Sequence, residues 1–239
     1  MVRGARRIAA GVSLLLGVLF TVSPAAALAA GDVVFRVYLR GTDIGSSSVS
    51  LAQDDAGWHI TSSAQLAEPF QLSLRQLEMH YDAAWRPLRM TMEQVSPDDS
   101  AVVHVAFGLA DGTTRTDIVR PGQALWGANK VSPDTIPLPD YVFAAYTALA
   151  ARLTNATVGM ELRVFVVPRF EAVLRLDSVD DQTLRTTSGT VAIKRWRATL
   201  QRPEGATPMH LWVSGGQMYR LDLPKEELLV IREDVLERR

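Results

Sequence analysis

The sequence predicts a mainly β protein, in which one continuous antiparallel sheet has a single apolar helix packed against it. Segments in which apolar and polar residues alternate follow one another from Val33 onward, separated by short turn signals. A segment rich in proline and glycine interrupts them at residues 120–139, and a helical pattern follows directly at residues 140–154. Both halves have the same alternating character, which favours one domain. A division at the proline-rich segment is the alternative.

The first 29 residues have the pattern of a secretory signal peptide. Three arginines precede an uncharged apolar stretch at residues 8–22, and Ala27 and Ala29 suit the small positions of a cleavage site. The stretch is short for a bilayer span, which takes about 20 residues. We therefore expect cleavage after Ala29, a mature domain of residues 30–239, and a periplasmic or other cell-envelope location. An uncleaved anchor is the alternative, and Sec and twin-arginine export both remain open.

Composition narrows the function further. The chain has no cysteine, so it has neither disulfides nor a site for lipid modification of a cysteine. Removing residues 1–29 takes away three arginines and no acidic residue, leaving 22 basic against 26 acidic residues and a formal net charge of −4. A mildly acidic protein is a poor candidate for nucleic acid binding. No second apolar stretch is long enough for a membrane span, so we expect no stable transmembrane segment after cleavage.

About seven strands are expected between Val33 and Val119, joined by turns such as Asp54–Gly57 and Asp111-Gly112. The alternation changes parity within one of them. Apolar residues occupy first even and then odd positions: Phe70, Leu72 and Leu74, then Leu77, Met79 and Tyr81. Because side chains alternate between the two faces of a strand, this change predicts a β-bulge near Arg75–Gln76. Two short strands with a tight corner are the alternative.

The middle of the chain changes character. Residues 120–139 contain too much proline and glycine for a central strand. In the helix that follows, Asp140 is the expected N-cap. Apolar residues recur around nearly all of the helix, which is typical of a helix buried on more than one side. Four further strand regions are expected after the helix, in the segments "VGMELRVFVV", "FEAVLRLDSV" and "GTVAIKRWRATL" and in the closing hairpin.

The closing hairpin carries a histidine, carboxylates and arginines that could suggest an active site. Gly215 and Gly216 suit a two-residue loop, because both can adopt positive φ. Folding about this loop is expected to form four cross-strand pairs: Val213–Met218, Trp212–Tyr219, Leu211–Arg220 and His210–Leu221. Asp222 would then lie on the other face of the hairpin, away from His210. We therefore interpret this stretch as a fold signature rather than a site.

Other candidate chemistry also has a simpler explanation. Three acidic pairs, Asp54-Asp55, Asp98-Asp99 and Asp180-Asp181, all fall in predicted turns, where aspartate is favoured for its local hydrogen bonds. None of the four histidines, His59, His80, His104 and His210, has metal-ligand spacing, although three neighbouring strands could bring the first three together. No nucleophile elbow, phosphate loop or dinucleotide fingerprint occurs. The sequence therefore predicts no enzymatic activity, no catalytic residue, no metal and no cofactor.

The apolar residues are the more informative group. Six of them share a face on neighbouring predicted strands, and two more lie on the helix: Phe70, Leu72, Leu74, Leu88, Met90, Met92, Phe143 and Tyr146. An ordinary filled core is one explanation for these residues. The sharper hypothesis is a curved sheet whose concave, apolar face is partly plugged by the helix, leaving a cavity for an acyl chain.

Several stretches resemble a family of exported bacterial proteins with a domain of unknown function. They are "YLRGTDIGSSSVSL", "LEMHYDAAWRPLRM", "LPDYVFAAYTALAARL" and "LWVSGGQMYRLDLPKEELLVIRED". That family in turn is similar to periplasmic lipoprotein carriers. The resemblance implies a strongly curved antiparallel sheet, a half-barrel or open barrel, with an apolar cavity. This sequence departs from the carriers in having one convincing helix rather than several.

Three functions are compatible with these patterns. The first is a non-enzymatic exported protein that binds a lipid or other amphipathic molecule in an apolar cavity, with a lipid or lipoprotein as its partner. The second is an envelope scaffold or assembly factor whose sheet edge or face binds another envelope protein. The third, an uncharacterised envelope hydrolase, lacks a supporting motif.

Overall fold

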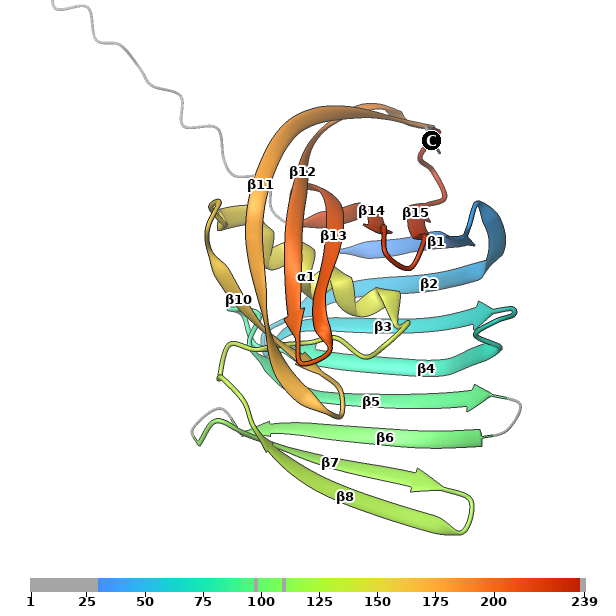
Figure 1. The fold of residues 1–239 in the computed structure, drawn as a ribbon, viewed down its shortest axis with the longest axis vertical. Helices are drawn as coiled ribbons and strands as arrows, with labels where there is room; N and C mark the ends of the chain where they lie inside the picture. Colours follow the sequence, from blue (N-terminus) through green and yellow to red (C-terminus); the bar gives the residue numbers. More distant parts are fainter. Residues whose placement is uncertain (1–29, 97–98, 109–110, 237–239) are drawn as a thin grey trace, which may run out of the picture.

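The structure, a computed structural model, describes residues 30–96, 99–108 and 111–236, so the predicted signal peptide lies outside the described residues. These residues form one sheet of 15 strands (Figure 1). The strands of the first half are β1 (Gly31–Leu39), β2 (Thr42–Asp54), β3 (Gly57–Leu66), β4 (Leu72–Tyr81), β5 (Pro87–Ser96), β6 (Asp99–Gly108), β7 (Thr113–Arg120) and β8 (Gln123–Lys130). Those of the second half are β9 (Ile136–Pro137), β10 (Glu161–Val166), β11 (Phe170–Thr186), β12 (Gly189–Arg202), β13 (Gly205–Ser214), β14 (Gln217–Leu223) and β15 (Leu228–Arg232).

Two antiparallel meanders make up this sheet. Strands β1 to β8 each pair with the next, and so do β10 to β15. The first and last strands then join the two halves, because β1 pairs with β15 from Phe35↔Arg232 to Leu39↔Leu228. The prediction of a mainly β protein with one large antiparallel sheet is confirmed.

The sheet is curved, but its edges do not pair with each other. The two edge strands, β8 and β9, stand at opposite ends of the strand order, yet only residues 131–135 separate them along the chain. The two ends of the sheet therefore lie near each other. In Figure 1, β1 to β8 form one layer and β10 to β13 cross in front of it. This arrangement is the predicted open barrel.

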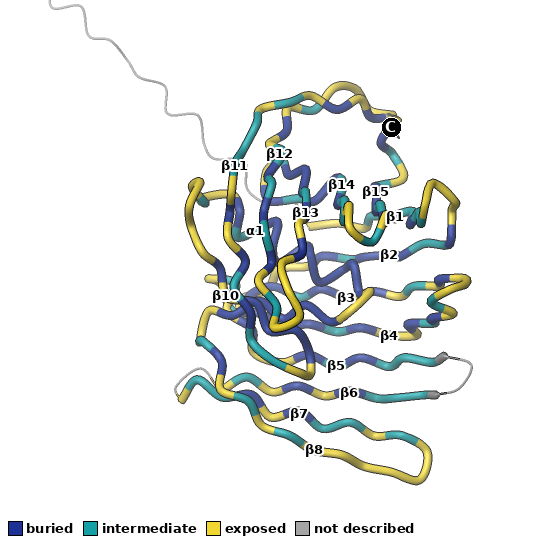
Figure 2. The backbone as a smooth tube through the Cα atoms, in the orientation of Figure 1, coloured by how far each residue is buried: buried dark blue, intermediate teal, exposed yellow. Residues whose placement is uncertain are grey.

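A short helical segment fills the space between the layers. It consists of η1 (Phe143–Ala145), α1 (Tyr146–Arg152) and η2 (Leu153–Asn155). Every residue from Val142 to Ala150 is buried, as expected for a helix that is apolar nearly all round. Figure 2 shows this burial where the layers meet, in contrast to the exposed backbone of β8.

The predicted N-cap at Asp140 is wrong. The first helical turn starts at Phe143, its N-cap is Val142, and no side chain caps it. Asp140 instead forms an ion pair with Arg169, and its other carboxylate oxygen lies 3.9 Å from an Arg202 guanidinium nitrogen. The two arginines therefore hold this carboxylate outside the helix.

The predicted bulge is confirmed. The pairing of β4 with β5 shifts between Leu74 and Gln76, so Arg75 is the extra residue, and the buried positions change parity there. A second shift on the same pair of strands was not predicted. His80 pairs with Arg89 and Tyr81 with Pro87, which leaves Leu88 as an extra residue. Leu88 is consequently 36% exposed, and its predicted place on the apolar face is wrong.

The structure agrees with the prediction that residues 120–139 form no central strand, whereas the predicted turn at Asp180-Asp181 is wrong. The segment rich in proline and glycine contains β8, which lies at the sheet edge, where such a segment is tolerated. Asp180-Asp181 is not a turn, because β11 continues through it, with Asp180 opposite Arg195 and Asp181 opposite Lys194. These opposite charges favour continued pairing of the two strands.

The turn at Asp54 is confirmed, since its carboxylate accepts hydrogen bonds from the backbone N–H of Ala56 and Gly57. Asp98 lies outside the described residues, and Asp99 begins β6.

Candidate functional site

The eight residues predicted to line an apolar cavity are mostly part of the main core. Six of them are buried: Leu72, Leu74, Met90, Met92, Phe143 and Tyr146. Phe70 is partly buried against Tyr141, with ring centroids 4.3 Å apart, and Leu88 is exposed. The helix packs into the same core as these strand residues. A ligand-binding role for these eight residues stays a prediction.

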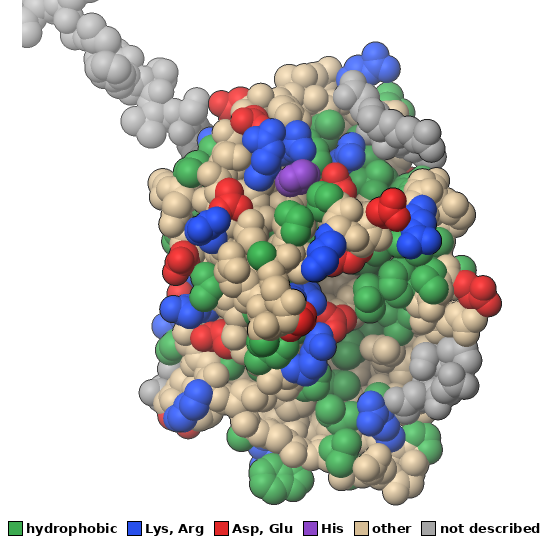
Figure 3. All heavy atoms as spheres, in the orientation of Figure 1, with side chains coloured by type: hydrophobic (Ala, Val, Ile, Leu, Met, Phe, Trp, Pro, Cys, Tyr) green, Lys and Arg blue, Asp and Glu red, His purple; other side chains and the backbone are tan. Residues whose placement is uncertain are grey.

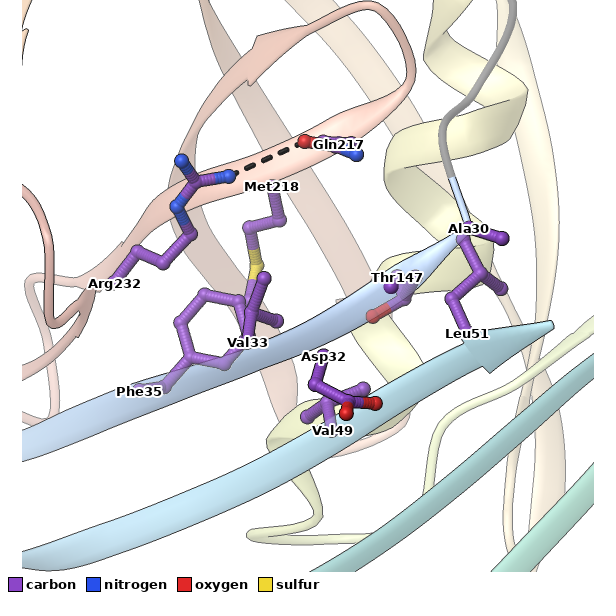
Figure 4. Close-up of a pocket in the computed structure, with 11 residues that line it drawn as sticks. Ala30, Asp32, Val33, Phe35, Val49, Leu51, Thr147, Gln217, Met218 and Arg232 are labelled. Carbon is purple, nitrogen blue, oxygen red and sulfur yellow. Dashed lines mark hydrogen bonds between the residues drawn. The ribbon is translucent and has the colours of Figure 1, made fainter. Parts of the chain in front are cut away.

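A different pocket opens where β1, β2, β14, β15 and α1 meet. Its volume is about 190 Å³. Its walls are mainly apolar and consist of Val33, Phe35, Val49, Leu51 and Met218, together with Ala30 and Gly31. Pairing explains this wall, because Val33 of β1 lies opposite Val49 of β2, and Gly31 opposite Leu51. Figure 4 shows Phe35 and Val33 near Met218 of the neighbouring meander.

Four polar residues also line this pocket: Asp32, Thr147, Gln217 and Arg232. The Arg232 guanidinium binds both carboxylate oxygens of Asp234, at 2.7 and 2.6 Å, and donates to Gln217 Oε1 at 3.2 Å (Figure 4). It also lies 3.9 Å from the centroid of the Tyr219 ring. Burial alone would lower the pKa of Arg232, but the hydrogen bonds and charges of Asp234 and Tyr219 together outweigh burial and raise this pKa. A permanent positive charge therefore stands beside an apolar hollow.

The size of this pocket limits what it can hold. Its volume lies below the range of roughly 300–1,000 Å³ that is usual for small-molecule pockets. It has room for one apolar end of a molecule rather than for a whole lipid. An amphipathic molecule suits such a site, because its polar part would lie at the rim beside Asp32 and Arg232.

The strand pairing brings only two of the four histidines together. The rings of His59 and His80 lie 4.4 Å apart, and His59 Nε2 is 2.8 Å from Asp54 Oδ2. Arg89 is within hydrogen-bond distance of His80 Nε2, at 3.1 Å. Burial, the charge of Arg89 and His59 all lower the pKa of His80. In the described part of the chain, no three His, Asp or Glu side chains are grouped as metal ligands.

The closing hairpin differs from its predicted register. Its Gly215-Gly216 loop and its Val213–Met218 pair are confirmed. The register then shifts, because Tyr219 is an extra residue, so Trp212 pairs with Arg220 rather than with Tyr219. The same shift replaces two other predicted pairs: Leu211 pairs with Leu221, and His210 with Asp222. The predictions that Asp222 faces away from His210 and that no carboxylate lies opposite it are wrong. His210 Nδ1 lies 3.6 Å from Asp222 Oδ2.

Comparison with known proteins shows that the chain matches a family of unknown function. Residues 34–224 match the model of a family described as protein of unknown function, DUF3108. This bears out the resemblance seen in the sequence. No curated protein matches the chain significantly. Among the described residues, no helix is both long enough and apolar enough to cross a membrane.

One solved structure supports the barrel-like architecture. A β-barrel-like protein of DUF1849 from Brucella abortus has a TM-score of 0.59 at 7% identity, covering 89% of this chain and 100% of that chain. A Bacteroides fragilis protein, described as exported and with a YmcC-like fold, has a TM-score of 0.33 at 8% identity, covering 86% and 95%. A DUF1089 family protein from Pseudomonas aeruginosa has a TM-score of 0.35 at 15% identity, covering 88% and 98%. The Brucella protein is similar to this chain in fold alone, and no conclusion rests on the other two.

Proposed function

Because this chain belongs to the DUF3108 family, whose function is unknown, we propose a function from its own geometry. The protein is exported to the periplasm or cell envelope, has no enzymatic activity, and binds a lipid or other amphipathic molecule. The apolar end of that molecule enters the pocket between β1, β2, β14 and α1. The observation that carries this proposal is an apolar pocket with a charged group on its wall.

The charge distribution supports an amphipathic ligand rather than a purely apolar one. Arg232 stands among apolar residues yet keeps its charge, because Asp234 pairs with it. Its stacking on Tyr219 and its bond to Gln217 hold the guanidinium in place. Such fixed polar groups beside an apolar wall set the orientation of a bound molecule.

A pair of adjacent valines on β1 tests this proposal. Val33 lines the pocket, whereas Val34 does not, and both side chains are half-buried. In Val33→Trp the larger ring is expected to fill the pocket and abolish binding. Val34→Trp adds the same volume outside the pocket and is expected to bind normally.

Native mass spectrometry of protein purified from the bacterial envelope measures the outcome. The wild type and Val34→Trp are expected to carry a bound mass that Val33→Trp lacks. They are also expected to take up a dansyl-labelled long-chain fatty acid. A wild type that is ligand-free and takes up no labelled fatty acid would contradict the proposal.

A second candidate function, binding of another envelope protein, is favoured by the β8 edge. Trp126 is 80% exposed there, beside Leu125 at 41% and Val119 of β7 at 48%. Strand β8 pairs with β7 on one side only, and just one of its eight residues, Lys130, is charged. Natural edge strands usually carry more protection against pairing with another chain. An open apolar edge suits the addition of a strand from a partner.

Crosslinking followed by pull-down from an envelope extract tests this second candidate. Trp126→Lys is expected to lose a partner that the wild type captures. Leu88→Lys, which places the same charge on an exposed apolar site of β5, is expected to retain it. Capture of the same proteins by both variants would contradict partner binding at the β8 edge.

For the hydrolase alternative, His80→Ala and His104→Ala should leave any detected hydrolysis unchanged, since neither histidine belongs to a recognisable catalytic set.

A further inference from the structure

A second, smaller core cluster lies apart from the main core. It consists of Leu184, Ile193, Trp212, Tyr219, Ile231 and Val235. The tip of the β11–β12 hairpin is tied to the C-terminal segment by two backbone bonds of 2.8 Å, Thr187 N–H to Asp234 O and Leu236 N–H to Arg185 O. Figure 1 shows β11 and β12 arching toward that segment. Buried side chains and backbone hydrogen bonds therefore hold this part of the sheet in a defined arrangement.

Trp212 belongs to this cluster and lies between two arginines on the neighbouring strands. Arg195 of β12 and Arg220 of β14 lie directly opposite Trp212 of β13. Their guanidinium carbons are 4.8 and 4.5 Å from the ring centroid. The indole N–H donates to Gln182 Oε1 at 2.9 Å, which fixes the ring. Because each guanidinium rests on the ring, both arginines are held in place before any ligand arrives.

These two arginines differ from their neighbours in having no ion-paired carboxylate among the described residues. Arg197 pairs with Asp180 at 2.8 Å and Arg232 with Asp234 at 2.6 Å. Among the described residues, no carboxylate oxygen lies within ion-pair distance of Arg195 or Arg220. Each also has a buried Nε atom without a hydrogen-bond partner. Among the described residues, the fold therefore leaves both guanidinium groups beside Trp212 without a direct ion pair.

A histidine and a carboxylate, His210 and Asp222, lie near the two arginines. Arg195 Nη2 lies 3.1 Å from His210 Nδ1. Burial lowers the pKa of Arg220, and Arg195 lowers it further, although Asp222 acts in the opposite direction. In Figure 3, Lys and Arg side chains gather around a histidine over β12 and β13, so the positive charge reaches the surface.

We propose that Arg195 and Arg220 bind a phosphate group beside Trp212. A carboxylate has two oxygens, and the fork of one arginine satisfies both. A phosphate group has three or more oxygens in a tetrahedral arrangement, so two guanidinium groups can share it. The phosphate belongs either to a lipid headgroup or to a free phosphate or small phosphoester. This site is separate from the apolar pocket and does not depend on the function proposed above.

Two probes distinguish the two sources of phosphate. Inorganic phosphate, titrated by calorimetry, tests for free phosphate. Cosedimentation with phosphatidylglycerol vesicles, compared with phosphatidylcholine vesicles, tests for an exposed anionic headgroup. Binding of inorganic phosphate supports a free phosphate or phosphoester, and preferential binding of phosphatidylglycerol vesicles alone supports a headgroup. Binding of neither probe, or equal binding of both vesicle types without phosphate binding, would overturn the proposal.

Two double variants of matched charge test the residues. Arg195→Gln with Arg220→Gln is expected to weaken binding by about tenfold or more, as loss of charged hydrogen bonds implies. Arg115→Gln with Arg175→Gln removes two arginines that pair with Asp117 and Asp177 and is expected to change affinity by less than about twofold. Equal loss in both double variants, or none in the first, would overturn the assignment.

A lysine double variant shows whether binding still depends on the guanidinium groups if the glutamine double variant misfolds. Arg195→Lys with Arg220→Lys keeps both charges but removes the planar forks, so about tenfold weaker binding is again expected. Melting temperatures of all variants show whether each is folded. Full affinity in a folded lysine variant would contradict the proposed guanidinium contacts.

Discussion

Met90 and Leu88 stand two positions apart on β5 and lie in opposite environments. Met90 is 1% exposed in the main core, whereas Leu88 is 36% exposed because it is the extra residue of a bulge. Truncation of a buried methionine removes core contacts and leaves a cavity, at about 2–5 kcal/mol. We expect Met90→Ala to lower the free energy of unfolding by that amount and Leu88→Ala by about 0.5 kcal/mol or less. Urea denaturation measures both, and equal losses would contradict the bulge.

Two half-buried histidines, His80 and His210, make stability depend on pH near neutrality. Burial lowers the pKa of both His80 and His210 in the folded state, helped by Arg89 and Arg195 respectively. Unfolded histidine has a pKa of about 6.5, so below that pH the unfolded chain takes up protons that the folded chain resists. The stability that the two histidines contribute is therefore present above about pH 6.5 and is lost as the pH falls from 7 toward 5.

Replacing both histidines isolates their contribution. In His80→Gln with His210→Gln, the difference between melting temperatures at pH 7 and pH 5 is expected to become smaller. The aspartates with lowered pKa affect stability in a lower pH range. Their contribution to the stability of the fold is lost only as the pH falls below about 3.9. They are Asp54, Asp82, Asp111 and Asp177. An unchanged difference between pH 7 and pH 5 in the double variant would refute the role of these histidines.

At the scale of elements, the packing of β2 depends on a glycine. Gly45 lies opposite Val37 of β1 and Leu66 of β3, with φ near +144°. A Cβ atom there would stand 1.9 Å from the carbonyl oxygen of Gln65. We expect Gly45→Ala to destabilise the fold by more than about 1 kcal/mol, because backbone would have to move and the φ is strained.

Gly127 on β8 provides the matched control for Gly45. A Cβ atom at Gly127 would meet nothing within 4 Å. Gly127→Ala is therefore expected to be neutral, or to stabilise by about 0.4–1 kcal/mol through the unfolded state. Thermal unfolding compares the two variants. A Gly45→Ala variant as stable as Gly127→Ala would show that β2 and β3 approach less closely than described.

Strand and helix positions follow from the sequence to different degrees. Alternation and turn residues predict the strands and the helical segment, because both depend on local pattern. The bulge at Arg75 is visible because the apolar parity changes within one strand. The bulges at Leu88 and Tyr219 are not, since cross-strand packing decides where an extra residue is accommodated. One such shift was enough to place Asp222 opposite His210 rather than away from it.

At the scale of the whole molecule, pairing of the first and last strands determines where sites can form. The apolar pocket exists because β1 and β15 join the two meanders next to α1. The row of Arg195, Trp212 and Arg220 exists because the bulge at Tyr219 shifts β14, so that Arg220 as well as Arg195 lies opposite Trp212. Neither arrangement has a local sequence signal, so the sequence predicted an apolar binding face on other residues. Of the eight residues predicted for it, none lines this pocket.

The most direct test of the proposed function is a crystal structure of the mature protein purified from its native envelope without added detergent. We predict elongated electron density in the pocket between Phe35 and Met218, with its polar end toward Arg232. The same crystals of Val33→Trp are expected to show only the new indole there. A wild-type pocket that contains nothing but ordered water would contradict binding of an amphipathic molecule.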